Sequence, residues 1–202
     1  MSVHLPPLPP TPGDGYQPAG RSIADTIAEE HRQLLGLTRR LVEPGPDPEH
    51  GREILVAALS RHLSAEEQYL LPAIRQALTD ADGPVSDVLA GDAALLMALR
   101  GLTDDRLAMV AQLVEAHVVA VDALVQRLCA NASEEELIRL GNRLEIAEEA
   151  APTRPHPGVP HTPPWNRIVE PAVAVLDKFR DAITGRHTQL SELDELDQPP
   201  QR

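Results

Sequence analysis

The sequence predicts an all-α fold, an up-down antiparallel four-helix bundle, from two observations. Apolar residues recur at steps of three and four along four segments, as expected of helices that bury one face. Short connections separate these segments, and short connections place successive helices antiparallel to one another. Strand signals are absent. The chain has one Trp, two Tyr and one Phe, so the core must consist mainly of Leu, Val, Ile and Ala.

The first two helices have local start and stop signals. Ser22-x-x-Asp25 is similar to a capping box and predicts the start of the first helix. The segment 43–46, Glu-Pro-Gly-Pro, ends that helix. Asp47 is a suitable cap for a second helix, which we expect to run to about Ala77.

Proline and glycine also delimit the following helices. Pro72 has no backbone N–H, so we expect it to kink or loosen the last turns of the second helix. The turn 80–84 leads into a third helix that ends at Gly101, and Thr103 is expected to cap the fourth. Ser133 begins a capping box and a fifth helix that runs to about residue 150.

The composition of the ends differs from that of the middle, which predicts five regions. They are a disordered tail rich in Pro and Gly over residues 1–20, a helical bundle over 21–150, a proline-rich linker over 151–165, a C-terminal helix over 166–185 and a disordered acidic tail over 186–202.

Polar residues interrupt the apolar face of each of the four bundle helices. They are His31 on the first helix, His62 and Glu66 on the second, Asp92 on the third and His117 on the fourth. His62 and Glu66 are four residues apart, so both point to the same side of their helix. A buried carboxylate needs a hydrogen-bonding partner, a proton or a cation. Imidazole and carboxylate together are the ligand set of iron and zinc, and such sites are built between facing helices of bundles.

Other polar residues have simpler explanations. Glu30, Glu67 and Asp122 fall on faces adjacent to the apolar ones, where we expect solvent exposure. Tyr69 lies on the inner side, where we expect core packing in preference to a hydrogen bond to a ligand or a bond to the metal. The remaining histidines are expected to be solvated, and they are His4, His50, His156, His161 and His187.

Composition and missing motifs exclude several classes of function. The net charge of −13 argues against a nucleic-acid partner, because no basic stripe is present to contact phosphates. A single cysteine, Cys129, is typical of a reducing cytoplasm. We expect neither a secretory signal peptide nor a stretch apolar enough to span a membrane. The sequence contains no His-Glu-x-x-His, no nucleotide-binding glycine motif and no Glu-x-x-His of a ferritin-type di-iron site.

Two segments resemble the hemerythrin-like (HHE cation-binding) family. His31, within Glu-Glu-His-Arg-Gln-Leu-Leu, looks like the first-helix histidine of that family. His62-x-x-x-Glu66, within His-Leu-Ser-Ala-Glu-Glu-Gln-Tyr-Leu-Leu-Pro, looks like its second-helix motif. The proline-dense segment after residue 150 is similar to the tails of actinobacterial members, so the resemblance extends over residues 21–185. It implies a helical bundle that binds iron and handles small oxidants such as dioxygen, peroxide or nitric oxide.

The second half of the chain departs from the family pattern at ligand positions. Asp92 stands where the family has a third-helix histidine. Val121 stands four residues after His117, where the family has a second glutamate. Asp122 is one residue further along and about 100° round the helix, so it cannot replace that glutamate without distortion. A di-iron centre would therefore lack ligands.

Three hypotheses follow. In the first, the protein is an iron protein that binds or reduces small oxidants, as the resemblance implies. In the second, a single metal ion, iron or zinc, serves storage, sensing or weak redox chemistry, and its ligands are His31, His62, Glu66, Asp92 and His117. In the third, the site is vestigial and the bundle is a metal-free binding or scaffolding module. We favour a hemerythrin-like metal-binding domain with a degenerate centre. Whether it is an enzyme is not determined by the sequence.

Overall fold

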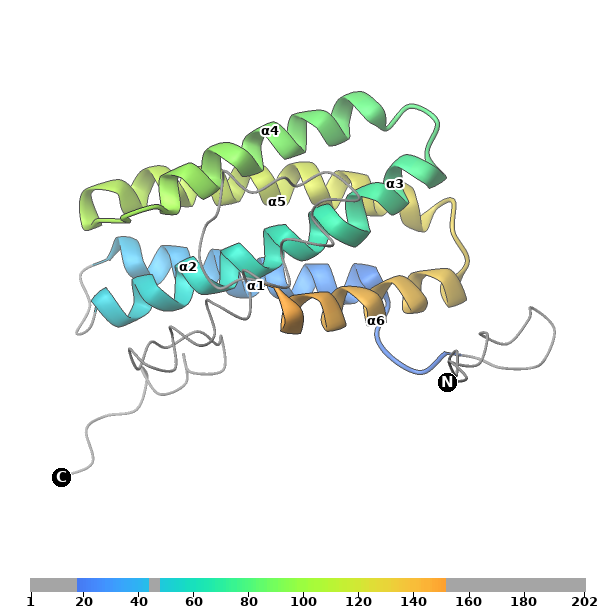
Figure 1. Cartoon of the computed structure of the whole chain (residues 1–202), viewed down its shortest axis with the longest axis horizontal. Helices are drawn as coiled ribbons and strands as arrows, with labels where there is room; N and C mark the ends of the chain where they lie inside the picture. The colour runs from blue at the N-terminus through green and yellow to red at the C-terminus, as the bar shows by residue number, and fades with distance from the viewer. Residues whose placement is uncertain (1–17, 44–47, 152–202) are drawn as a thin grey trace, which may run out of the picture.

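The computed structural model describes residues 18–43 and 48–151. Helices connected by short turns make up this part of the chain, and no strand occurs in it, which confirms the all-α class (Figure 1). The helical elements are α1 (Ile23–Val42), α2 (Pro48–Ala65), the π-helix η1 (Glu66–Leu70), α3 (Leu71–Ala77), α4 (Asp82–Leu99), the 3₁₀ turn η2 (Asp104–Arg106), α5 (Leu107–Cys129) and α6 (Glu134–Ala150).

The long helices lie side by side along the longest direction of the molecule (Figure 1). Helix α1 packs against α5, α2 and α6, and α4 packs mainly against α5. Helix α6 packs against α1, α2 and η1. Helix α1 thus has neighbours on several sides and lies at the centre of the packing.

Local signals set the helix ends much as the sequence predicts. The Ser22 side chain accepts a hydrogen bond from the backbone N–H of Asp25, and Ser133 forms both halves of a capping box with Glu136. Gly101 has a φ of 61°, a left-handed conformation that favours glycine after a helix. The expected cap at Thr103 is wrong in detail: Thr103 precedes the 3₁₀ turn η2 and its side chain makes no capping hydrogen bond.

The second helix is interrupted, as expected from Pro72. The backbone N–H of Leu71 donates to the carbonyl of Glu66, five residues earlier, which widens this turn into a π-helix. Pro72 follows directly, and its ring would clash with the carbonyl four residues before it in a regular α-helix. The wider turn begins at Glu66, so a residue of the polar site starts the irregular segment. Such π-turns are frequent at functional sites.

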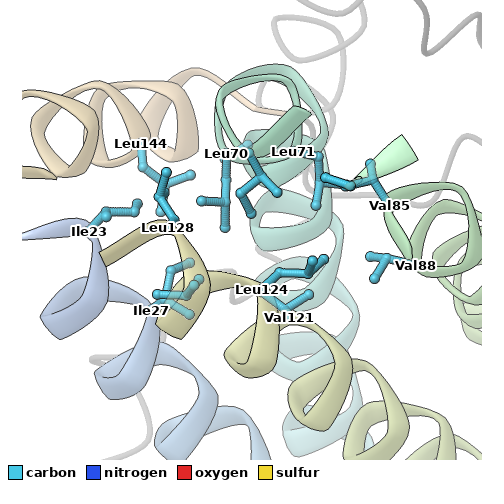
Figure 2. Packing of buried hydrophobic residues seen from close by; sticks show 14 of the residues in the cluster. Ile23, Ile27, Leu70, Leu71, Val85, Val88, Val121, Leu124, Leu128 and Leu144 are labelled. Atoms are coloured by element: carbon cyan, nitrogen blue, oxygen red, sulfur yellow. The ribbon is translucent and has the colours of Figure 1, made fainter. Parts of the chain in front are cut away.

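The core consists of two apolar clusters separated by a polar layer. One, which we call the first apolar cluster, contains Ile27 and Val121. Figure 2 shows part of this cluster around Leu70 and Leu124. The other contains residues from the opposite end of the helices, such as Leu34. On each helix the polar residue lies between members of the two clusters. We call these residues the polar layer: His31, His62, Glu66, Asp92 and His117, all of them buried.

One expectation about membranes is wrong as stated. The segment Asp104–Cys129 is long and apolar enough, by length and composition alone, to cross a membrane. A buried core helix passes the same test, and the buried side of α5 packs against α1 and α4. The absence of a membrane partner stays a prediction.

Several sequence-based predictions fall outside the described residues. They are most of the N-terminal tail, the cap at Asp47, the proline-rich linker, the C-terminal helix and the acidic tail.

Candidate metal centre

Three imidazoles and one carboxylate meet in the polar layer. His31 comes from α1, His62 from α2, Glu66 from η1 and His117 from α5. One ligand atom of each residue lies within 4.8 Å of those of the other three. Four of the five predicted ligands therefore come together, and the exception is Asp92.

The ring nitrogens Nε2 of the three histidines face the carboxylate of Glu66. The Nε2 atoms of His62 and His117 each lie 3.3 Å from an oxygen of Glu66, and that of His31 lies 3.7 Å away. The Nε2 atoms of His62 and His117 are themselves 3.3 Å apart. The rings stand edge to face, with centroids 5.1 to 5.4 Å apart and interplanar angles of 74° to 80°. They thus surround a common point instead of stacking.

These spacings are close to those between the ligands of a tetrahedral metal site. Ligands at bond lengths of roughly 2.0–2.1 Å lie about 3.3–3.4 Å apart at the corners of a tetrahedron. The Nε2 atoms of His62 and His117 are 3.3 Å apart, and each lies 3.3 Å from one of the two oxygens of Glu66. An ion between the four groups would hold them where the helices already place them.

Unpaired buried atoms point to the same conclusion. Neither oxygen of Glu66 accepts a hydrogen bond from any described residue, and the Nε2 of His31 also has no such partner. Glu66 is fully buried and His31 is nearly so. Leaving a buried carboxylate without compensation is costly, whereas a divalent cation satisfies carboxylate and imidazole together.

The other ring nitrogen of each histidine is held by a carboxylate from a different helix. The Nδ1 of His31 lies 2.7 Å from Asp122, and the Nδ1 of His117 lies 2.7 Å from Asp92. Glu30 lies 2.9 Å from the Nδ1 of His62. An Nδ1–H that donates to a carboxylate leaves the Nε2 lone pair free for a metal and fixes the orientation of the ring.

Asp92, which the sequence analysis predicts as a metal ligand, lies outside the group of four ligand residues. It is buried, as expected, but its carboxylate accepts from His117 on the side away from Glu66. Its helix, α4, packs chiefly on α5, which brings it to the back of the His117 ring.

The sequence analysis missed Glu30 and Asp122, for which it expected solvent exposure. Asp122 is 44% exposed, and yet one of its oxygens reaches the buried ring of His31. Glu30 is 15% exposed. Each of them directly adjoins a residue of the apolar face in the sequence, and this position was the available signal of a role near the core. Their partners, however, lie on other helices and up to 91 positions away in the chain. Tyr69 is partly buried against the first apolar cluster, in agreement with the packing role expected for it.

The electrostatics of the centre favour a charged carboxylate. Burial alone would raise the pKa of Glu66, but the nearby imidazoles of His62 and His117 hold it well below its usual value. Burial opposes charging of His117, and the carboxylates of Glu66 and Asp92 overcome this and raise its pKa to about 9. In the same way Glu66, Glu148 and Glu30 outweigh burial and raise the pKa of His62. Without a metal, protons on the His62 and His117 rings would supply the counter-charge to Glu66.

The outer carboxylates have the opposite shift. Burial raises the pKa of Asp92, and the hydrogen bond from His117 only partly offsets it. Burial also raises the pKa of Glu30 to about 7, against the effect of His62. These two groups depend on their histidine partners to stay ionised.

Comparisons of the chain with models of protein families, with curated proteins and with solved structures find no match. The argument for function therefore rests on the residues of this chain.

Proposed function

We propose that this chain is a hemerythrin-like metal-binding protein that holds one divalent ion between His31, His62, Glu66 and His117. In this proposal α1, the interrupted helix from α2 to α3, α4 and α5 form the up-down antiparallel four-helix bundle, and α6 packs against it. The observation that carries the proposal is the convergence of three Nε2 atoms on a buried carboxylate that accepts no hydrogen bond from the described residues.

The donor set favours one ion over a di-iron centre. Glu66 is the one carboxylate of the group formed with the three histidines, whereas Asp92 binds the far nitrogen of His117. Val121 occupies the position of a second glutamate and is buried in the first apolar cluster. Two bridged irons would therefore lack ligands among these residues.

Iron and zinc both suit three imidazoles and a carboxylate. The resemblance to hemerythrin-like proteins favours iron, and the tetrahedral spacing suits zinc. Bound iron would supply the capacity to bind or reduce dioxygen, peroxide or nitric oxide, as the resemblance implies. The chain's own residues would hold the ion, orient the rings through Nδ1 and keep bulk water away from the centre.

Metal analysis tests this proposal. Protein from cells supplied with iron and zinc should hold about one ion per chain, and a chelator should lower the Tm because the ion binds the folded state. The double variant His62→Leu, Glu66→Leu should hold none and should be insensitive to the chelator. A His156→Gln, His161→Gln variant is the control and should behave as wild type. Two tightly held irons per chain would contradict the single-ion proposal.

A metal-free module is the second candidate, and one observation favours it. Because the pKa values of His62 and His117 are raised, protonated rings can neutralise Glu66 without an ion. Under this alternative the purified protein holds no metal, and its Tm is the same with and without chelator and with added iron or zinc.

A further inference from the structure

A small cavity opens on the outer side of His62, between α1, α2 and α6. Its volume is about 30 Å³, which is enough for a water molecule or a small ion. The lining residues are Glu30, Leu34, Ala58, Arg61, His62 and Glu148.

Two carboxylates in this cavity face the same ring nitrogen. Besides Glu30 at 2.9 Å, an oxygen of Glu148 lies 3.5 Å from the Nδ1 of His62. One ligand atom from each of the three residues lies within 4.8 Å of the others, as in the inner centre. Glu30 is 15% and Glu148 23% exposed, so these carboxylates reach solvent, whereas Glu66 is fully buried.

His62 belongs to both groups. Its Nε2 faces Glu66 in the inner centre, and its Nδ1 faces Glu30 and Glu148 in the cavity. The two groups are therefore the two sides of one ring, one side open to solvent and the other closed.

We propose that Glu30, Glu148 and the Nδ1 of His62 form an outer cation site, at which a divalent ion binds before it passes to the inner centre. This inference rests on the proposed function, because it supplies the route by which the inner ion arrives. The two carboxylates attract the cation at the surface, and His62 is the ligand that both sites share.

The shared ring makes the two sites alternatives. A neutral imidazole has one nitrogen with a free lone pair and one that carries the proton. When an ion occupies the outer site, Nδ1 binds it and Nε2 carries the proton. When an ion occupies the inner site, Nε2 binds it, and Nδ1 carries the proton and donates a hydrogen bond to Glu30. Arg61 also lines the cavity. The outer site is thus transient, and the final content stays at one ion.

The rate of metal uptake tests this site. Metal-free full-length protein is mixed with Co²⁺ in a stopped-flow instrument, and the visible absorption of bound Co²⁺ is followed over time. Glu148→Gln should slow uptake by about tenfold or more, because local carboxylates concentrate cations at the entrance. Glu134→Gln is the matched control: it removes the same charge from an exposed position on α6, about 21 Å along the helix from Glu148, and should leave the rate unchanged. Near physiological ionic strength charges beyond about 8 Å are largely screened, so the two variants separate a local from a general effect.

Final stoichiometry and affinity complete the test. The outer site is supported if Glu148→Gln takes up Co²⁺ slowly and reaches the same content as wild type. It is overturned if Glu148→Gln and wild type load at the same rate, or if the variant loses affinity without a change in rate, since Glu148 would then only orient His62. Whatever the variant does, a wild-type protein that binds one Co²⁺ supports the proposal of the inner metal centre. A wild type that takes up no Co²⁺ would overturn both proposals.

Discussion

The segment of α2 and η1 and the segment of α5 differ at one position of a shared pattern. Each supplies a histidine whose Nε2 faces the centre, His62 from α2 and His117 from α5. Four residues later the first segment has Glu66 and the second has Val121. Glu66 lies among the three imidazoles, and Val121 packs in the first apolar cluster near Leu124 (Figure 2).

The next residue of α5 shows what the difference means. Asp122 is rotated by about 100° from Val121, which turns its carboxylate toward α1. There it bonds the Nδ1 of His31 at 2.7 Å. A shift of one residue on a helix therefore separates a carboxylate that can bind a metal from one that orients a metal ligand.

The largest expected effect comes from making α5 like α2. Val121→Glu places a carboxylate in the apolar cluster and should lower the free energy of unfolding by several kcal/mol, measured by urea denaturation of metal-free protein. The matched control is Val119→Glu on the same helix, where the side chain is 71% exposed and the substitution should have little effect. Iron is then added to the Val121→Glu variant. If the variant regains stability and binds a second iron, α5 keeps the geometry of α2. Equal stability of the two variants would contradict the core position of Val121.

A smaller effect is expected from the carboxylate that α5 does have. Asp122→Ala removes the acceptor for the Nδ1–H of His31 and should weaken metal binding by about 10- to 100-fold. Competition with a chelator of known affinity measures this change. Glu115→Ala on the exposed side of α5 removes the same charge without contact to the centre and should leave affinity unchanged. Asp122→Ala with wild-type affinity would show that Asp122 does not position His31.

The smallest expected effect is a dependence of stability on pH that differs between the metal-free and the metal-loaded protein. In the metal-free protein the pKa of His117 is about 9 and that of His62 is also raised, so the folded state binds these protons more tightly than the unfolded state. The resulting stabilisation is complete below about pH 6.5 and is lost as the pH rises through about 9. Metal ligands must be deprotonated, so metal binding strengthens over the same range.

The difference in Tm between metal-loaded and metal-free protein should therefore grow by a few degrees between pH 6.5 and 9. Thermal unfolding at a series of pH values measures it. Parallel curves for the two forms would show that His62 and His117 do not exchange protons for metal.

The sequence by itself determined the helices and the residues of the polar layer. Periodicity at steps of three and four, Ser22 and Ser133 as caps and Pro72 as a helix breaker all act within a few residues of chain. Such short-range causes can be read from the sequence, and the described helices agree with them. The same periodicity identified His31, His62, Glu66 and His117, because each interrupts an otherwise apolar face of its helix. The antiparallel order of the four helices stays a prediction.

Only the tertiary structure decided which polar residues meet. Asp92 and Glu66 look alike in the sequence, since each is an acidic residue on an apolar face. Asp92 faces the back of the His117 ring because α4 packs on α5, whereas Glu66 lies at the beginning of a π-turn in the middle of the three rings. Asp122, Glu30 and Glu148 border apolar faces and give no periodic signal of their own. Their roles depend on which helix lies opposite and at what rotation, and the many weak contacts between helices set that rotation, not the local spacing of residues.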